Sequence, residues 1–184
     1  MSIESALELA AMRAAGRVVA ATLHAVAREL KAGVTTRELD DVARLEFARH
    51  GARSGPQIVF GYPGAICISV NEEAVHGIPG NRVIKPGDMV TIDVTAELDG
   101  FYADAAVTHL VEPIAKRARA LKECAEAAFQ KGAAQARCGA PVWKIGEAVE
   151  REVSRRGFRV LRGLCGHGIG RSVHEEPQDR KSVV

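Results

Sequence analysis

Apolar residues near the start of the chain recur at three- and four-residue steps. This spacing places side chains on one face of an α-helix. Val19, Leu23, Val26 and Leu30 form such a stripe. The pattern therefore predicts a helix from about residue 5 to residue 31 that buries one face.

A capping pattern marks the start of a second helix. Thr35 is followed three residues later by Glu38, the spacing of a capping box, in which each side chain accepts a hydrogen bond from the other residue's backbone. Gly51 is suited to the position after the last turn, because glycine readily adopts the left-handed conformation found there. We predict a helix that runs from Thr35 to His50.

The middle of the chain changes to the alternation of apolar and polar residues that is typical of β-strands. Residues 66–70 are predicted to form a half-buried strand, and residues 90–94 repeat the alternation after a Lys-Pro-Gly-Asp turn. Asp99-Gly100 is a strong hairpin signal. The segment 101–110 should therefore return antiparallel to the preceding strand.

The second half of the chain repeats the order of elements seen in the first. We predict a helix at about 114–136, a shorter helix between Pro141 and Gly157, and a strand at 158–161. The apolar face of the longer helix is predicted to contain four residues, Ala118, Leu121, Ala125 and Ala128. A His-Gly-Ile loop follows the strand in each half, but a hairpin follows only the first loop. The sequence therefore predicts an α+β fold with two pseudo-symmetric halves, of which the second is incomplete.

Bulk composition is that of a globular protein. The chain has 184 residues, 47% hydrophobic and 26% charged, and a formal net charge of +2. This overall charge gives no reason to expect nucleic acid or an anionic membrane as a partner, and no stretch approaches the length of a membrane span. The four cysteines contain no C-x-x-C pair, which favours reduced thiols in a cytoplasmic protein.

Two aspartates on the predicted hairpin are candidates for metal binding. If Asp99-Gly100 is a two-residue loop, Thr95 pairs with Asp104, and Asp93 lies on the same face because side chains alternate along a strand. Two such carboxylates repel each other, and one or two divalent cations between them would relieve the repulsion. The alternative is that Asp104 decorates an exposed edge and Asp93 caps a turn.

A glycine-rich loop at 163–174 carries two histidines, His167 and His174. Imidazole beside carboxylates is a suitable ligand set for Zn, Mn, Fe or Co. His167 lies between glycines, which offer little packing, so we interpret it as a ligand. The remaining histidines outside the loops (His24, His50 and His109) are more simply explained as structural residues.

The motifs in these segments resemble those of the type I methionine aminopeptidases, in the same order from about residue 3 to residue 178. They are Gly61-Tyr62-Pro63, Cys67-Ile68-Ser69-Val70-Asn71-Glu72, His76-Gly77-Ile78-Pro79, Ile92-Asp93-Val94, Asp99-Gly100-Phe101, Gly166-His167-Gly168-Ile169-Gly170-Arg171 and His174-Glu175-Glu176-Pro177. The resemblance implies the pita-bread fold and the removal of the initiator methionine from new polypeptides whose second residue is small.

The resemblance also implies a site with two divalent metal ions (Co, Mn, Fe or Zn) that activate water for attack on the methionyl carbonyl. Asp93 resembles the aspartate that chelates the first metal, Asp104 the aspartate that bridges both, and His167 the histidine ligand of the second. Two further histidines, His76 and His174, resemble those that contact substrate and stabilise the developing oxyanion. Tyr62 and Cys67 match positions that line the methionine pocket.

The chain departs from the family at its end. The family's last two ligands are glutamates, and neither has an equivalent here, so we expect the second metal to bind weakly and the chain to be inactive or weakly active. We interpret residues 1–178 as a single pita-bread domain that lacks its C-terminal portion. Residues 179–184 can be encoded by the start of a common sequencing adapter, and we expect this tail to be foreign.

Two other functions remain open at this stage. One is a pita-bread binding protein without catalysis, and the other is a proline-specific peptidase of the same fold. The expected partners are the N-terminal methionine of nascent peptides and, through them, the ribosome. We expect a monomer that does not associate with membranes.

Overall fold

The computed structural model describes residues 3–179 and divides the chain into two compact units. The first unit comprises the residues up to 114 together with 169–174, and the second comprises 115–168 together with the residues from 175 onward. Each unit is described separately. No helix in the described part of the chain combines the length and apolar character needed to cross a membrane. Residues 180–184, most of the tail interpreted as foreign, lie outside the described residues.

The first unit begins with two helices, α1 (Ala6–Glu29) and α2 (Thr36–His50). The predicted capping box is present, since the Thr35 side chain accepts from the Glu38 backbone and the Glu38 side chain accepts from that of Thr35. Gly51 closes α2 in the left-handed conformation with φ 64°. The sequence therefore predicted both helices and the bounds of the second one correctly.

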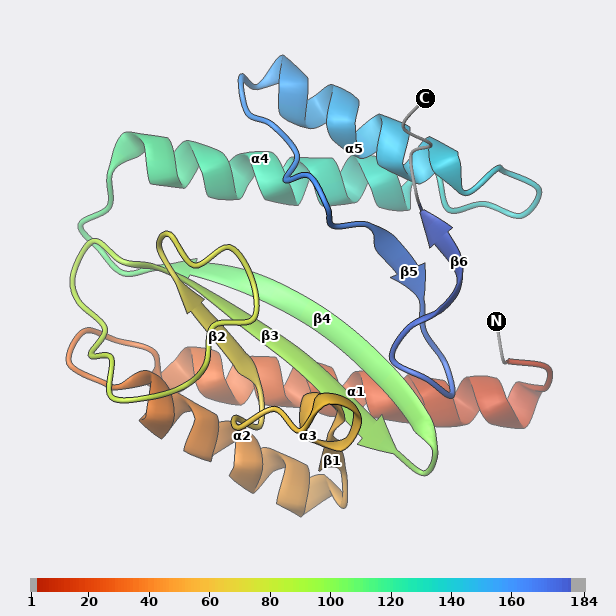
Figure 1. Cartoon of the computed structure of the whole chain (residues 1–184), viewed down its shortest axis with the longest axis horizontal. Coiled ribbons are helices and arrows are strands. Elements are labelled where there is room, and N and C mark those ends of the chain that lie inside the picture. The colour runs from red at the N-terminus through yellow and green to blue at the C-terminus, as the bar shows by residue number, and fades with distance from the viewer. Residues whose placement is uncertain (1–2, 180–184) are drawn as a thin grey trace. The chain divides into compact units, whose positions relative to one another are not determined.

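An antiparallel sheet follows, with β3 (Met89–Leu98) at its centre. One edge of β3 pairs with β1 (Arg53–Ser54) and β2 (Cys67–Val70), and the other pairs along its full length with β4 (Phe101–Leu110) (Figure 1). Asp99 and Gly100 form the turn between β3 and β4, both with positive φ. Thr95 lies opposite Asp104, as predicted.

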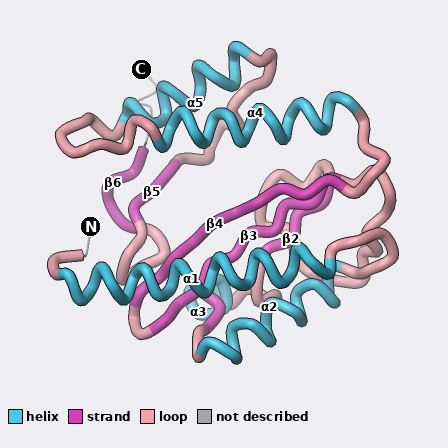
Figure 2. The backbone as a smooth tube through the Cα atoms, turned by 180° about the vertical axis from the view of Figure 1, so that it is seen from behind, coloured by secondary structure: helices cyan, strands magenta, loops and turns pink. Residues whose placement is uncertain are grey.

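Helices α1 and α2 cover one face of this sheet, which is seen from the helix side in Figure 2. The hydrophobic core lies between the two layers and is formed by the predicted α1 stripe, by one face of α2, and by inward residues of β2 and β3. Its most buried members include Val26, Leu39, Ile66, Ile68, Val70, Val90, Ile92 and Val94. Burying such side chains contributes about 1.5–3 kcal/mol each, which makes this core the main stabilising feature of the unit.

The prediction that β2 is half-buried was wrong, because both of its faces are covered. Cys67 and Ser69, on the side away from the core, are only 4% and 3% exposed. The loop that follows β2 folds back along it: the Gly77 N–H donates to Ser69 Oγ (3.0 Å), and the Ile68 N–H donates to the Gly77 carbonyl (2.8 Å). Local alternation could not reveal this loop, and the short helix α3 (Gly55–Phe60) was also missed.

The second unit contains the helices α4 (Lys116–Ala133) and α5 (Trp143–Arg155), which pack side by side (Figures 1 and 2). It also contains a small antiparallel pair of strands, β5 (Gly166–Gly168) and β6 (Glu175–Asp179). The buried side of α4 is formed by Cys124, Ala128 and Gly132.

The apolar face predicted for α4 was therefore mostly wrong, since Leu121 and Ala125 are exposed. Contact with α5 selects the buried side: a Cβ at Gly132 would lie 2.9 Å from Val149, so the small residues of α4 allow a close approach of the two helices.

Residues 158–161 do not form the predicted strand. A strand requires a partner, and this segment pairs with no other in the part of the chain that the structure describes. The Phe158 N–H donates instead to the Val153 carbonyl at the end of α5 (3.1 Å). The four cysteines are all free, as expected for reduced thiols.

Candidate metal and substrate site

The two predicted metal-binding aspartates share one face of the hairpin formed by β3 and β4. Asp93 lies opposite Ala106, two residues along the ladder from the Thr95–Asp104 pair. The Thr95 hydroxyl donates a hydrogen bond to Asp104 Oδ1 (3.0 Å), which orients that carboxylate on the sheet. Asp93 is half-buried and Asp104 is exposed. The alternative in which Asp93 caps a turn is wrong, since Asp93 lies in the middle of a ten-residue strand. Asp104 does lie exposed on β4, which pairs only with β3 within residues 3–179.

Burial, followed by the negative charge and the hydrogen bond of Asp104, raises the pKa of Asp93 to about 7. The ionised form is disfavoured there because a carboxylate that has lost part of its water faces a second one. A divalent cation would remove this cost, and carboxylate oxygens are ligands that Mn, Fe, Co and Zn accept. The pair therefore fits the metal site that the sequence predicts.

Cys67 and Tyr62 extend this site across the sheet. Cys67 lies directly opposite Asp93 in the β2–β3 ladder. Burial is the main cause that raises the pKa of the Cys67 thiol to about 11, and the charges of Asp93 and Asp104 act in the same direction. Burial, together with the neighbouring Cys67, also raises the pKa of Tyr62. Both groups therefore stay neutral at pH 7 and offer a surface suited to an uncharged side chain.

The Tyr62 hydroxyl fixes the loop that carries His76. It donates to the Gly77 carbonyl (2.7 Å) and lies 3.3 Å from the His76 carbonyl. His76 has φ 56°, a left-handed conformation that a non-glycine residue adopts at some cost, and its side chain is exposed. Gly77 has no room for a side chain, because a Cβ there would lie 2.3 Å from the Ile68 carbonyl oxygen. Close packing of this glycine against β2 therefore sets the position of His76.

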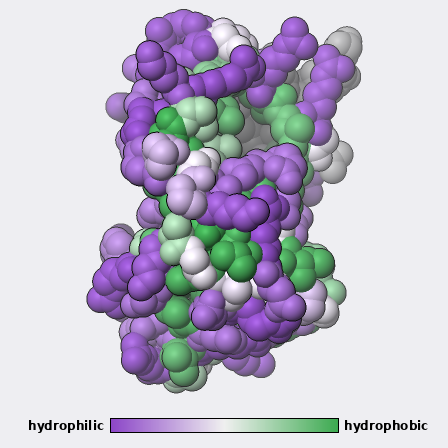
Figure 3. Space-filling view, turned by 90° about the vertical axis from the view of Figure 1, so that its left-hand side faces the viewer, coloured by the Kyte–Doolittle hydropathy of each residue, from purple (hydrophilic) through white to green (hydrophobic). Residues whose placement is uncertain are grey.

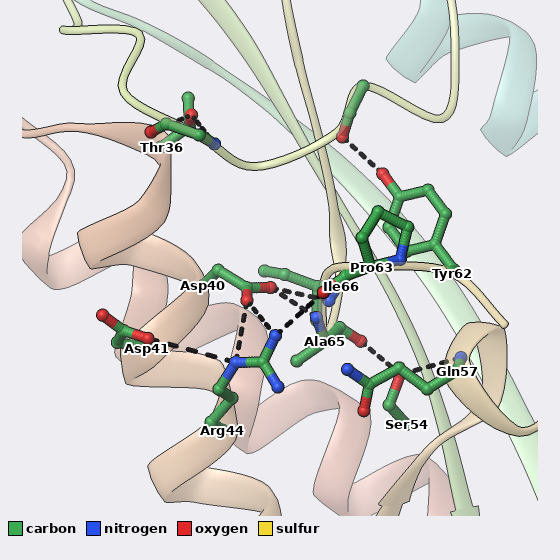
Figure 4. A network of polar contacts seen from close by, with 12 residues as sticks. Thr36, Asp40, Asp41, Arg44, Ser54, Gln57, Tyr62, Pro63, Ala65 and Ile66 are labelled. Carbon is green, nitrogen blue, oxygen red and sulfur yellow. Dashed lines mark hydrogen bonds and ion pairs between the residues drawn. The ribbon is translucent and has the colours of Figure 1, made fainter.

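A buried carboxylate on α2 anchors the segment that leads from Tyr62 into β2 (Figure 4). Asp40, 3% exposed, accepts hydrogen bonds from the backbone N–H groups of Ala65 (2.7 Å) and Ile66 (3.0 Å). Its other oxygen pairs with Arg44, whose guanidinium also donates to the Pro63 carbonyl (3.2 Å). This network holds the backbone of the pocket segment against α2.

The segment 169–174 belongs to the first unit and brings His174 to it. The His174 ring lies 5.9 Å from the ring of Phe60 at the end of α3. Arg171 is paired with Glu8 in the first turn of α1 (2.6 Å), and its guanidinium lies 4.4 Å from the centre of the Phe101 ring. The segment is thus fastened to both α1 and the tip of the hairpin.

His167 is the third predicted metal ligand and lies in β5 of the second unit, opposite Gln178. Its Nδ1 lies 2.9 Å from the Gly168 carbonyl oxygen. Among residues 3–179, no three His, Cys, Asp or Glu side chains gather in a group that could hold a metal. The structure brings Asp93 and Asp104 together, and the role of His167 as a ligand stays a prediction.

Sequence reasoning missed three residues that support the site. Asp40 lies within the buried stripe of α2 beside Leu39 and Ala43, and a charge at such a position was the available signal. Phe60 and Arg171 act through contacts between segments far apart in the sequence, which no local pattern encodes.

Comparison with known proteins agrees with the geometry. The model of metallopeptidase family M24 matches residues 10–182. Methionine aminopeptidase 2 of Bacillus subtilis is 41% identical over 178 residues, which are 96% of this chain and 72% of that protein. Methionine aminopeptidase 1 of the same organism is 41% identical over 171 residues, or 93% of this chain and 69% of that protein.

Solved structures give the same result and identify the fold as the pita-bread fold. Methionine aminopeptidase from Rickettsia prowazekii superimposes with a TM-score of 0.92 at 35% identity, covering 97% of this chain and 72% of that one. Prolidase from Pyrococcus furiosus shares the fold alone, with a TM-score of 0.85 at 19% identity over 98% of this chain and 52% of that one. Since the family model and these relatives cover nearly the whole chain, it belongs to metallopeptidase family M24 and, within it, to the methionine aminopeptidases.

Proposed function

We propose that this chain carries metal-binding and substrate-binding groups for the removal of N-terminal methionine from polypeptides whose second residue is small. The observation that supports this most directly is the carboxylate pair on β3 and β4, which is electrostatically unfavourable without a cation. Its relatives among the methionine aminopeptidases support the same activity.

In this proposal, Asp93 and Asp104 hold a divalent metal ion, and His167 provides a further ligand. Bound divalent metal supplies a Lewis acid and lowers the pKa of water so that hydroxide is available near neutral pH. The Thr95 hydroxyl keeps Asp104 oriented. The complete site would hold two divalent ions, and Co, Mn, Fe and Zn are the candidate metals.

The substrate is held by residues from three segments. His76 and His174 donate hydrogen bonds to the carbonyl oxygen of the peptide bond that is cleaved, and negative charge that develops on this oxygen is stabilised by such donors. Tyr62 and Cys67, neutral and largely buried, line the pocket for the methionine side chain, which is apolar and polarisable.

We propose that residues 1–184, tested alone, are inactive or only weakly active, because only three of the metal ligands that the resemblance implies (Asp93, Asp104 and His167) lie within them. A site with fewer carboxylates balances less of the metals' positive charge, so the second metal should bind more weakly. We further propose a cytoplasmic monomer that meets its substrates as they leave the ribosome, because N-terminal methionine is most accessible there.

Calorimetric titration of the 184-residue chain with Mn²⁺ tests the metal site. We expect binding by the unmodified protein and at least tenfold weaker binding by Asp93→Asn. Asp99→Asn is the matched control, since Asp99 lies exposed in the turn of the same hairpin and asparagine tolerates its positive φ. Equal binding by Asp93→Asn and Asp99→Asn would remove the carboxylate pair from the proposal.

Peptide assays with Mn²⁺ or Co²⁺ then test the substrate. Release of methionine from a Met-Ala peptide, however slow, and its loss in Asp93→Asn would support the proposal. Cleavage of Xaa-Pro peptides without cleavage of Met-Ala would favour a proline-specific peptidase. Binding of a Met-Ala peptide without cleavage, in a chain that binds no metal, would favour a non-catalytic binding protein.

A further inference from the structure

The overall charge of +2 conceals an uneven distribution along the chain. Residues 115–168, which form most of the second unit, contain twelve Lys and Arg against five Glu, a net charge of +7. The remaining residues are therefore net acidic. The overall charge of +2 therefore does not describe this segment, which is strongly basic.

Many of these cations gather at one end of the helix pair. The start of α4 and the end of α5 meet around an open hollow of about 390 Å³, lined by Ala120, Glu123, Arg155, Arg156 and Phe158. This end of the pair faces the viewer at the top of Figure 3, where hydrophilic residues (purple) predominate. We call it the basic end and define it by Lys116, Arg117, Arg155, Arg156 and Arg159.

Two arginines of the basic end are held in place by a buried acid. Glu152, 7% exposed, accepts from Arg155 Nη2 (2.6 Å) and Nε (3.0 Å) and from Arg156 Nε (2.7 Å). These hydrogen bonds lower the pKa of Glu152 to about 2, so it stays ionised. Glu152 thus orients two guanidiniums at the hollow. Counting Glu123, which also lines the hollow, the basic end has five cations against two carboxylates. The other N–H groups of the two guanidiniums can bind the oxygens of an anion.

The other members of the basic end are exposed and have no ion pair within residues 3–179. Lys116 and Arg117 lie in the first turn of α4, which contains no acidic residue. Cations are unfavourable there because the helix dipole is positive at that end. Repulsion among these groups would be relieved by an anionic partner, in the same way that a metal relieves the aspartate pair.

We propose that the basic end of the second unit binds the phosphate backbone of a single-stranded nucleic acid. Arginine forks bind phosphate oxygens in pairs, and Phe158, half-buried in the wall of the hollow, offers a ring on which a base can stack. The combination of oriented arginines and an aromatic ring distinguishes a single-stranded nucleic acid, which has bases, from polyanions without bases. This site is separate from the proposed peptidase function and can succeed or fail independently of it.

Fluorescence anisotropy with a labelled, unstructured RNA oligonucleotide tests the proposal on the unmodified chain. The logarithm of the binding constant for a single strand falls linearly with the logarithm of the salt concentration. The slope is about 0.7 for each phosphate that the protein neutralises. We expect Arg117→Glu combined with Arg159→Glu to make the slope shallower by about 1.4 or more and to weaken binding on the order of tenfold at low salt. Far-ultraviolet circular dichroism checks that both proteins are folded.

The matched control is Arg13→Glu combined with Arg17→Glu. These residues are exposed on α1 in the first unit, and the pair changes the net charge by the same amount. We expect this control to bind RNA almost as the unmodified chain does. Equal weakening in both double variants, or no binding of RNA at low salt, would overturn the proposal.

A second comparison separates RNA from other anions. Phe158→Leu should weaken RNA binding with an unchanged salt slope and leave binding of polyphosphate unaffected, because polyphosphate has no base to stack. If polyphosphate, polyglutamate or vesicles of anionic lipid bind as tightly as RNA and respond in the same way to Phe158→Leu, the assignment to a single-stranded nucleic acid is wrong.

Discussion

The carboxylate pair makes the metal-free protein less stable at neutral pH, and Asp93→Asn should reverse this effect. Asparagine has nearly the same shape as aspartate, carries no charge, and can donate a hydrogen bond to Asp104. The variant therefore keeps the packing of β3 and removes the repulsion. We expect it to be more stable than the unmodified chain in the absence of metal while it loses metal affinity.

The size and pH range of the effect come from the pKa of Asp93. Its value rises from the ordinary 3.8 to about 7 in the folded protein, so between these pH values the folded state holds more protons than the unfolded state. Stability then falls as the pH rises through this range and levels off above it. The two values set an upper bound of about 4 kcal/mol. Asp104 is exposed and its charge is partly screened, so we expect about 2 kcal/mol.

Urea unfolding at pH 5 and pH 8, with a chelator present, measures this difference. The unmodified chain should lose about 1 kcal/mol more than Asp93→Asn between the two pH values, because part of the effect is already lost below pH 5. Asp99→Asn, on the same hairpin, should behave as the unmodified chain does. Adding Mn²⁺ at one hundred times its dissociation constant should then restore about 2.7 kcal/mol to the unmodified chain and to Asp99→Asn, but not to Asp93→Asn.

Two results would refute this reasoning. Asp93→Asn could be no more stable than the unmodified chain at pH 8, which would mean that the carboxylates do not repel each other. The pH dependence of stability could also be the same in both proteins, which would mean that a group other than Asp93 titrates in this range.

Three further changes have defined outcomes. Asp40→Ala should lower the free energy of unfolding by about 3–5 kcal/mol in chemical denaturation, because it leaves buried N–H groups and a cation without their acceptor; Asp41→Ala, exposed on the same helix, should have almost no effect. Gly77→Ala should cost about 1–3 kcal/mol or more, since its Cβ would meet backbone at 2.3 Å; a thermal melt unchanged by this substitution would contradict the close packing. Glu97 has a lowered pKa because Arg53 and the Gly100 N–H bind its carboxylate. The ionised Glu97 therefore stabilises the folded protein fully above its unfolded pKa, and this stabilisation is lost as the pH falls through its lower pKa in the folded state. Urea unfolding from pH 6 to pH 3 should show a smaller loss of stability in Glu97→Gln than in the unmodified chain.

The hairpin shows how far local sequence determines this structure. Asp99-Gly100 favours a tight turn with positive φ at both positions. Once the turn is set, the pairing of every residue on β3 and β4 follows by counting. The shared face of Asp93 and Asp104 was therefore available from the sequence. The apolar stripe likewise predicted α1, and the capping box and Gly51 predicted the bounds of α2, because these signals act within a few residues.

Other features depended on segments that are distant in the chain. The outer face of β2 is buried because a later loop returns to it, and residues 158–161 are not a strand because no segment pairs with them among residues 3–179. Asp40 has its acceptor role only because residues 65 and 66 lie against α2.

The sequence by itself determined the first two helices, the hairpin register and the family, since each rests on residue types at fixed short spacing. Only the tertiary structure decided the electrostatics: how far Asp93 is buried, which backbone groups Asp40 binds, and that Glu152 orients two arginines at one end of a helix pair. Desolvation and hydrogen bonding depend on what surrounds a group in space, and that environment is created by packing rather than by neighbours in the chain.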